Sequence, residues 1–230
     1  MSQARPSRRP APAVADEPDV PVVWSRQTWI ALLVMAALIA VVIGSGVLIK
    51  RALEPPVPSA LAGCKTSTQT GQREYLGLQP MCITPGQKLT ATITTSQGDV
   101  VVQLHPEVAP VTVNNFVVLA IHGYYNGLVF WKAEDWVVQG GDPRGNGTGG
   151  PGYNLPDEPS NDAWDVGALG MARVPGGPVN GSQFFIEKGA WPGSGPQAVY
   201  NRFGTVTSGM DKVQALGVTD TINSITIKVS

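Results

Sequence analysis

Charge is scarce in this sequence, and neither sign predominates. Lysine, arginine, aspartate and glutamate together make up 14% of the 230 residues, and the formal net charge is -1. A chain that binds nucleic acid usually carries a basic excess, and a solvating tail usually carries an acidic one. We therefore expect no nucleic-acid partner.

Metal-binding side chains are also few. The chain has two histidines, His105 and His122, and two cysteines, Cys64 and Cys82. They form no Cys-x-x-Cys or His-x-x-x-His spacing, which is what most structural and catalytic metal sites require. The sequence therefore predicts no metal centre.

Glycine and proline are abundant but not concentrated. The 27 glycines and 20 prolines are spread through the chain. This distribution favours a loop-rich β protein over a low-complexity one.

The N-terminal part divides into a polar tail and an apolar stretch. Residues 1–28 bury little apolar surface, so we expect a disordered cytoplasmic tail. Residues 29–49 carry no charge and are flanked by Arg26 and Lys50. About twenty such residues span the ~30 Å hydrocarbon core of a bilayer. A buried helix would need a polar face, and a cleaved signal peptide usually has a shorter apolar core, so residues 29–49 predict one transmembrane helix.

The orientation of that helix depends on the cysteines. Basic residues lie on both sides of the span and give no clear answer. Cys64 and Cys82 follow the span closely, and a disulfide between them would place the C-terminal part in an oxidising compartment. Two unpaired thiols are the alternative. The stretch Leu61–Cys64 is similar to a lipoprotein cleavage box, but it lies too far beyond residue 49. We expect a single-pass cell-membrane protein with an extracytoplasmic C-terminal domain.

Residues 50–88 are expected to form a linker and a loop that the disulfide could close. The proline-rich segment Glu54–Ser59 favours an extended, stiff chain.

From residue 89 onward the pattern is that of a mostly β domain. Leu89–His105 alternates around a turn at Ser96–Asp99, which predicts a hairpin. Val111–His122 follows a proline and ends at a glycine, and Ser208–Leu216 is a second short helical segment. Many short strands and two helices indicate an antiparallel barrel or sandwich over residues 89–230.

Three strings in this domain are distinctive: Gln139–Pro143, Gly147–Tyr153 and Asn180–Ile186. A phosphate-binding loop would need a following Lys-Ser/Thr pair and a helix N-terminus, and neither is present. The glycines therefore favour tight backbone turns at strand ends.

In their order and spacing, these strings resemble the cyclophilin family of peptidyl-prolyl isomerases, in a bacterial membrane-anchored form. The resemblance covers residues 89–230. Further matching stretches are Val113–Gly123, Tyr125–Gly127, Phe203–Val206 and Gly209–Asp211. The resemblance implies a closed eight-stranded antiparallel barrel with a helix at each open end. It also implies that proline-containing polypeptide segments bind without any cofactor.

Matching the strings position by position implies a set of site residues. The catalytic pair would be Lys132 and Gln139, where Gln139 orients the cation. The remaining positions would contact the substrate, with Phe185 as the floor of a proline pocket. They are Phe130, Trp136, Val137, Ala172, Arg173, Gln183, Phe185, Trp191 and Tyr200. Without the resemblance, such aromatic side chains would more often belong to a core.

One departure bears on the activity. The family usually has arginine where this chain has Lys132, and lysine lacks the planar fork that bonds two partners at once. Glu134 or Asp135 could pair with Lys132, and Arg173 could supply a cation from another loop. Two hypotheses follow. The first is an isomerase of X-Pro bonds in extracytoplasmic proteins, slowed by Lys132. The second is a catalytically weak cyclophilin-like binding module or chaperone.

Overall fold

The computed structural model describes residues 30, 33–35, 37–39, 56–84, 86–192 and 199–230. The expected tail, residues 1–28, lies outside the described residues. Within the expected transmembrane segment, residues 30, 33–35 and 37–39 are helical. No helix among the described residues is long and apolar enough to cross a membrane. Pro55–Ser230 forms one compact unit.

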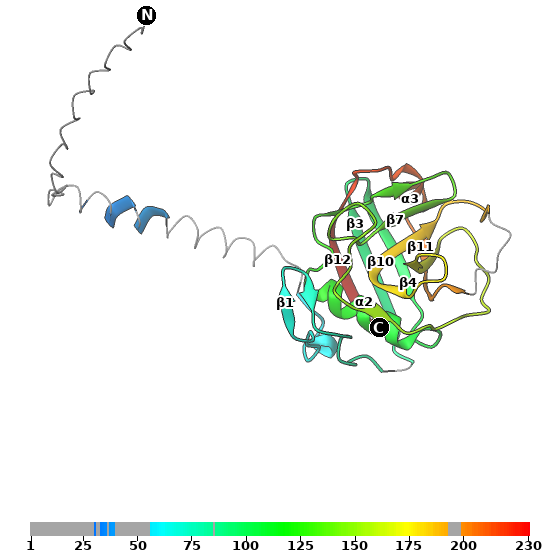
Figure 1. The fold of residues 1–230 in the computed structure, drawn as a ribbon, viewed down its shortest axis with the longest axis horizontal. Helices are drawn as coiled ribbons and strands as arrows, with labels where there is room; N and C mark the ends of the chain where they lie inside the picture. Colours follow the sequence, from blue (N-terminus) through cyan, green and yellow to red (C-terminus); the bar gives the residue numbers. More distant parts are fainter. Residues whose placement is uncertain (1–29, 31–32, 36, 40–55, 85, 193–198) are drawn as a thin grey trace, which may run out of the picture. The chain divides into compact units, whose positions relative to one another are not determined.

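This unit is rich in short strands. In chain order its elements are η1 (Ser59–Leu61), β1 (Gln69–Gly71), β2 (Glu74–Tyr75), β3 (Leu89–Thr95), β4 (Gly98–Leu104), α2 (Pro110–Ile121), β5 (Leu128–Val129), β6 (Lys132–Ala133), β7 (Val137–Gly140), β8 (Asn154–Leu155), β9 (Ala168–Arg173), β10 (Val179–Glu187), β11 (Arg202–Ser208), α3 (Met210–Ala215) and β12 (Thr221–Val229). The expected β3–β4 hairpin and both expected helices are present (Figure 1).

The main sheet has ten strands and is a curled antiparallel sheet, not the closed eight-stranded barrel that we expected. Its strands follow the order β5-β12-β3-β4-β11-β9-β10-β7-β6, with β8 beside β10. The two end strands, β5 and β6, are successive parts of one segment. Residues 128–129 pair with β12, whereas residues 132–133 pair with β7. Because these two pieces follow each other along the chain, they do not pair side by side, and the ladder stays open.

Alternation places one face of the sheet against the core. In β3, buried residues alternate with half-buried ones along the whole strand, as the period of two requires. The long strand β12 pairs with β3 from Ile222 to Val229. The inner face of the sheet therefore packs against a continuous core that includes Phe116, Phe184 and Phe203.

Helix α2 is buried along most of its length. Residues 112–120 are all buried, although a helix that covers only one sheet would expose its far face. Its N-terminus is closed by Glu158, whose carboxylate accepts hydrogen bonds from the amides of Val111 and Thr112 at 2.9 and 2.8 Å. A negative charge at this end is favourable because it meets unpaired amides and the positive end of the helix dipole.

The far face of α2 is covered by residues 56–84 and 86–88, called here the N-terminal extension. Leu61, Tyr75 and Ile83 of the extension are buried in the core of the unit. Asn114 of α2 joins the two parts: its Oδ1 accepts from the amide of Cys82 at 2.8 Å, and its Nδ2 donates to the Pro80 carbonyl at 3.0 Å. The described residues of the segment expected as a linker and disulfide loop, 50–88, thus pack against α2.

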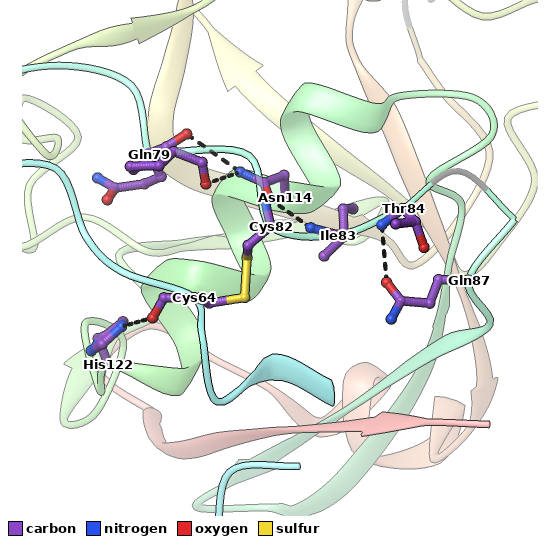
Figure 2. The surroundings of a disulfide bond; sticks show 9 residues. Cys64, Gln79, Cys82, Ile83, Thr84, Gln87, Asn114 and His122 are labelled. Atoms are coloured by element: carbon purple, nitrogen blue, oxygen red, sulfur yellow. Dashed lines mark hydrogen bonds between the residues drawn. A yellow bond between two sulfur atoms is a disulfide. The ribbon is translucent and has the colours of Figure 1, made fainter. Parts of the chain in front are cut away.

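A disulfide closes this extension. Cys64 and Cys82 are bonded, with Cα atoms 5.3 Å apart (Figure 2). The Cys64 carbonyl accepts a hydrogen bond from His122, just beyond α2, at 3.0 Å. Asn114, near the start of α2, therefore holds Cys82, and His122, just beyond the end of α2, holds Cys64.

Candidate active site

The expected catalytic pair lies on one hairpin. Strands β6 and β7 pair so that Lys132 is directly opposite Gln139, and β10 continues the row with Phe185 opposite Gln139. Strand β9 adds Gly170 opposite Phe185. Residues opposite one another in a sheet project from the same face. Lys132, Gln139, Phe185 and Gly170, called here the cross-strand row, therefore share the outer face.

Lys132 is held at its charged end by two neighbours. Its Nζ lies 3.2 Å from Oε1 of Glu134 and 5.5 Å from the centre of the Trp136 ring. The other oxygen of Glu134 accepts a hydrogen bond from Nε1 of Trp136 at 2.6 Å. The ammonium thus rests against a carboxylate and an indole face.

Gln139 is oriented by Gln183. The Nε2 of Gln139 donates to Oε1 of Gln183 at 3.0 Å, and the same oxygen accepts from Nε1 of Trp131 at 3.1 Å. The Nε2 of Gln183 donates to the carbonyls of Gly147 and Gly149. A side-chain amide offers two donors and two acceptor lone pairs. All four of these are used at Gln183, which thereby holds the side-chain amide of Gln139 in place.

An aromatic cluster lies beside this pair, formed by Trp136, Trp164, Phe185, Trp191 and Tyr200. Tyr200 meets Phe185 edge-on with ring centres 5.3 Å apart, and Trp191 meets Trp136 in the same way at 4.7 Å. Offset and edge-to-face contacts are the preferred arrangements of aromatic rings. Val137 and Ala172 pack within the same group. The structure therefore brings six of the expected substrate-contacting residues together.

Phe130 belongs elsewhere, which corrects one expectation. Its side chain is fully buried in the main core, not in the aromatic cluster. A Cβ on Gly140 would lie 2.9 Å from the Phe130 ring, so that glycine is needed for the ring to fit under β7. Phe130 supports the hairpin from the inner face and does not reach the site.

Arg173 is also committed. Its guanidinium donates to the carbonyls of Gly177 and Val199 and pairs with Asp157 at 3.0 Å. These bonds tie the end of β9 to Val199, next to Tyr200. In this arrangement the guanidinium of Arg173 is engaged by Gly177, Val199 and Asp157.

Sequence reasoning missed Trp131 and Trp164. Trp131 completes the hydrogen bonding of Gln183, and Gly147 leaves space for its ring. Trp164 stacks on Phe185, with ring centres 5.7 Å apart and planes inclined by 17°. The available signal for Trp164 was a large aromatic side chain within the polar stretch Asn161–Asp165.

One buried carboxyl group lies on the same strand as Phe185. Glu187 of β10 is buried, and burial together with the nearby charge of Asp165 raises its pKa from 4.5 to about 7, against the opposing effect of Arg202. It lies opposite Val137 in the sheet. Because Glu187 is two residues from Phe185, it projects from the same face of the sheet, and its ionisation near neutral pH adds charge to that face.

Fold and site together define a cyclophilin-like domain. The family model described as "Cyclophilin type peptidyl-prolyl cis-trans isomerase/CLD" matches residues 90–229. The chain therefore belongs to the cyclophilin-type peptidyl-prolyl cis-trans isomerase family, a family of isomerase enzymes.

Relatives and solved structures agree with this assignment. Peptidyl-prolyl cis-trans isomerase B of Bacillus subtilis is 40% identical over 129 residues, which cover 55% of this chain and 88% of the relative. A putative peptidyl-prolyl cis-trans isomerase of Staphylococcus saprophyticus is 46% identical over 106 residues, or 44% of this chain and 53% of the relative. The chain thus spans only about half the length of the staphylococcal protein.

Among solved structures, a Cryptosporidium parvum cyclophilin-type isomerase determined in the presence of the dipeptide Ala-Pro is similar. It has a TM-score of 0.56 and 30% sequence identity, and the match covers 61% of this chain and 99% of that chain.

Proposed function

We propose that this chain is a peptidyl-prolyl cis-trans isomerase in which Lys132 is the catalytic cation. The observation that carries the proposal is the cross-strand row, which sets Lys132, Gln139 and Phe185 side by side on one face. A cation, a side-chain amide opposite it in the sheet and an aromatic floor for a proline ring are thereby available to one bound peptide.

The reaction needs little more than these groups. Amide resonance gives the X-Pro bond a barrier of about 18–20 kcal/mol to rotation. In the twisted transition state the proline nitrogen regains a lone pair, and a donor placed at that nitrogen lowers the barrier by electrostatic stabilisation. Lys132 supplies this donor, while Phe185 and Tyr200 hold the proline ring as the preceding carbonyl turns.

Lysine performs this task less well than arginine would. An ammonium on a flexible stem carries a point charge, whereas a guanidinium can bond Gln139 and the peptide in one plane. The carboxylate of Glu134 also forms an ion pair with Lys132, with Oε1 and Nζ 3.2 Å apart. We therefore infer a slower enzyme than one with arginine at this position. The same ion pair favours the second candidate function, a binding module that holds proline-containing segments with little turnover.

The two functions are separated by exchange NMR of an Ala-Pro peptide with catalytic amounts of the full chain. For the isomerase, Lys132→Ala lowers kcat by about 10²-fold, the loss expected for one preorganised donor, while peptide affinity stays the same. Lys132→Arg keeps or raises kcat. The exposed strand residue Lys228 provides the matched control, and Lys228→Ala leaves both quantities unchanged. Peptide binding without acceleration of exchange by the unmodified chain would establish the binding module instead.

We also propose that residues 29–49 anchor the chain in a cell membrane and that the domain acts on extracytoplasmic proteins. The uncharged length of this stretch and the Cys64–Cys82 disulfide support this location. On fractionation of cells, the full chain should stay with membranes after an alkaline wash, and a protease added outside the membrane should cut the domain. Release by the wash, or protection from the protease, would contradict the anchor or its orientation respectively.

A further inference from the structure

The cross-strand row has no side chain at Gly170, and the ring of Trp164 occupies the space above this glycine. Gly170 is the fourth member of the row and lies opposite Phe185. A Cβ at Gly170 would fall 2.6 Å from Cζ of Phe185 and 2.7 Å from Cη2 of Trp164, closer than real contacts allow. Only glycine therefore lets Trp164 lie beside Phe185, on the side away from Gln139.

Trp164 contacts the pocket floor with a specific geometry. Its ring stacks on Phe185 at 5.7 Å with planes inclined by 17°, and it meets Tyr200 edge-on at 6.2 Å. Phe185 and Tyr200 are the two rings that the proposed function assigns to the substrate proline. A single tryptophan outside the expected site thus contacts both of them.

The segment that carries Trp164 is anchored on both sides. Residues 156–167, called here the β8–β9 loop, are bound through Asp157 to Arg173 at 3.0 Å and through Asp162 to Arg202 at 3.4 Å. The amide of Gly167 donates to the Glu187 carbonyl at 2.8 Å. The loop is therefore fixed to strands β9, β10 and β11, and it can hold the indole in one orientation.

Hydrogen bonding by the indole does not explain a tryptophan at position 164. Its Nε1 is buried and has no hydrogen-bond partner among the described residues. A buried donor without a partner is unfavourable, and phenylalanine would avoid that loss while keeping an aromatic ring. The stacking surface of the ring is therefore what Trp164 contributes.

From these observations we propose that Trp164 is a positioning residue, which sets the orientation of the Phe185 floor and thereby the selectivity for proline. The proposal rests on the proposed function, because it assigns a role in the same pocket. Trp164 contacts the rings of the floor and not the Lys132 end of the row, so it acts on ring binding and not on the twisting amide. The proline ring stays in place during rotation, and an interaction equal in ground and transition states changes KM and not kcat.

The test compares Trp164→Ala, Trp164→Phe and the unmodified full chain, using an Ala-Pro peptide and its Ala-Ala counterpart. Trp164→Ala should raise KM for the Ala-Pro peptide about three- to tenfold, in line with the loss of one aromatic pair, with kcat unchanged. Affinity for the Ala-Ala peptide should change little, so the preference for proline falls. Trp164→Phe should restore KM and selectivity, because it keeps a stacked ring. Lys132→Ala should show the opposite pattern, with kcat lowered and KM unchanged.

A merely structural role would lower the melting temperature of Trp164→Ala without altering the ratio of the two peptide affinities, and that result would overturn the proposal. The NMR signals of the Phe185 ring give a readout that is independent of activity, because loss of the stacked indole shifts them. If the unmodified chain binds Ala-Pro peptide without turnover, the proposed function fails but the affinity ratio still decides the role of Trp164. If the unmodified chain does not prefer Ala-Pro to Ala-Ala peptide, both proposals are wrong.

Discussion

The ammonium of Lys132 forms an ion pair with the carboxylate of Glu134. Glu134 is about half exposed and forms an ion pair with Lys132, and exposed pairs of this kind contribute about 0.2–1 kcal/mol. Glu134→Gln removes the charge but keeps an oxygen that can accept from Trp136. Freed from its partner, Lys132 should donate better, and kcat should rise about two- to fivefold in the exchange assay.

The control for this variant is Glu107→Gln, which removes a similarly exposed glutamate that pairs with His105. It should leave kcat unchanged. A fall in kcat with Glu134→Gln would mean that the carboxylate positions the ammonium instead of competing for it.

Glu187 should make stability fall as pH rises towards neutrality. Burial and the charge of Asp165 raise its pKa to about 7, whereas the unfolded chain keeps a value near 4.5. Between these pH values the folded state binds more protons than the unfolded state. The stabilisation is therefore complete below about pH 4.5 and is lost as pH rises through about 7. Urea unfolding across this range should show the decline, and Glu187→Gln should flatten it. An identical slope in both proteins would contradict the assignment.

At the scale of single residues, matching the sequence motifs to the family was informative for residues whose positions are set by strand register. The family resemblance named Lys132 and Gln139 as a pair, and the register of β6 against β7 sets these two residues opposite each other. Gln183 was harder to interpret, because only the folded chain brings Trp131 and the glycine carbonyls to it. Trp164 could not be predicted from local pattern, since its contact with Phe185 joins a polar loop to a distant strand.

Among the secondary-structure elements, α2 and the extension depend on each other. Asn114 and Asn115 are buried polar residues in an apolar helix, and each has a partner on a different segment. Asn114 binds the extension, while Asn115 donates to the Gly181 carbonyl at 2.7 Å and accepts from the Tyr153 hydroxyl. Buried amides with full hydrogen bonding specify which segments lie together.

The disulfide should contribute strongly to the stability of this arrangement. Cys64 and Cys82 are 18 residues apart, and closing a loop of about that length stabilises a fold by roughly 3 kcal/mol through restriction of the unfolded chain. We expect the double variant Cys64→Ala, Cys82→Ala to lose about 2–4 kcal/mol of unfolding free energy in urea.

Adding a thiol reductant provides the internal control for the disulfide. It should lower the stability of the unmodified protein to that of the double variant and should leave the variant itself unchanged. Equal stability of the two proteins without reductant would show that the loop is already held by its other contacts.

The elements that could be predicted are those with a strong local period. Strand β3 alternates over seven residues, and α2 begins at a proline, so both were visible in the sequence. The open sheet was not, because it depends on residues 128–129 pairing with β12 while residues 132–133 pair with β7, and both partners are distant in the sequence or set by the fold. The buried extension was not visible either, since Leu61, Tyr75 and Ile83 are too widely spaced to form a period.

At the scale of the whole molecule, the N-terminal extension contributes side chains to the main hydrophobic core. Leu61 is fully buried within the same hydrophobic cluster as Phe116 and Leu89. A cluster that spans residues 61 to 227 has no boundary near residue 90, where the family match begins. The folding unit is therefore larger than the region that carries the family resemblance.

Two leucines of the extension test this conclusion. Leu61→Ala should lower the unfolding free energy of the whole unit by about 2–5 kcal/mol, the usual cost of removing a buried leucine side chain. Leu76 is 74% exposed, so Leu76→Ala should change the unfolding free energy very little. Intrinsic fluorescence reports on the six tryptophans, four of which (Trp131, Trp136, Trp164 and Trp191) lie far along the chain from Leu61. If the extension and the domain unfold as one cooperative unit, the Leu61→Ala transition seen by fluorescence shifts to lower urea while remaining single. An unchanged fluorescence midpoint would mean that the extension unfolds by itself and that the core of the domain is complete without it.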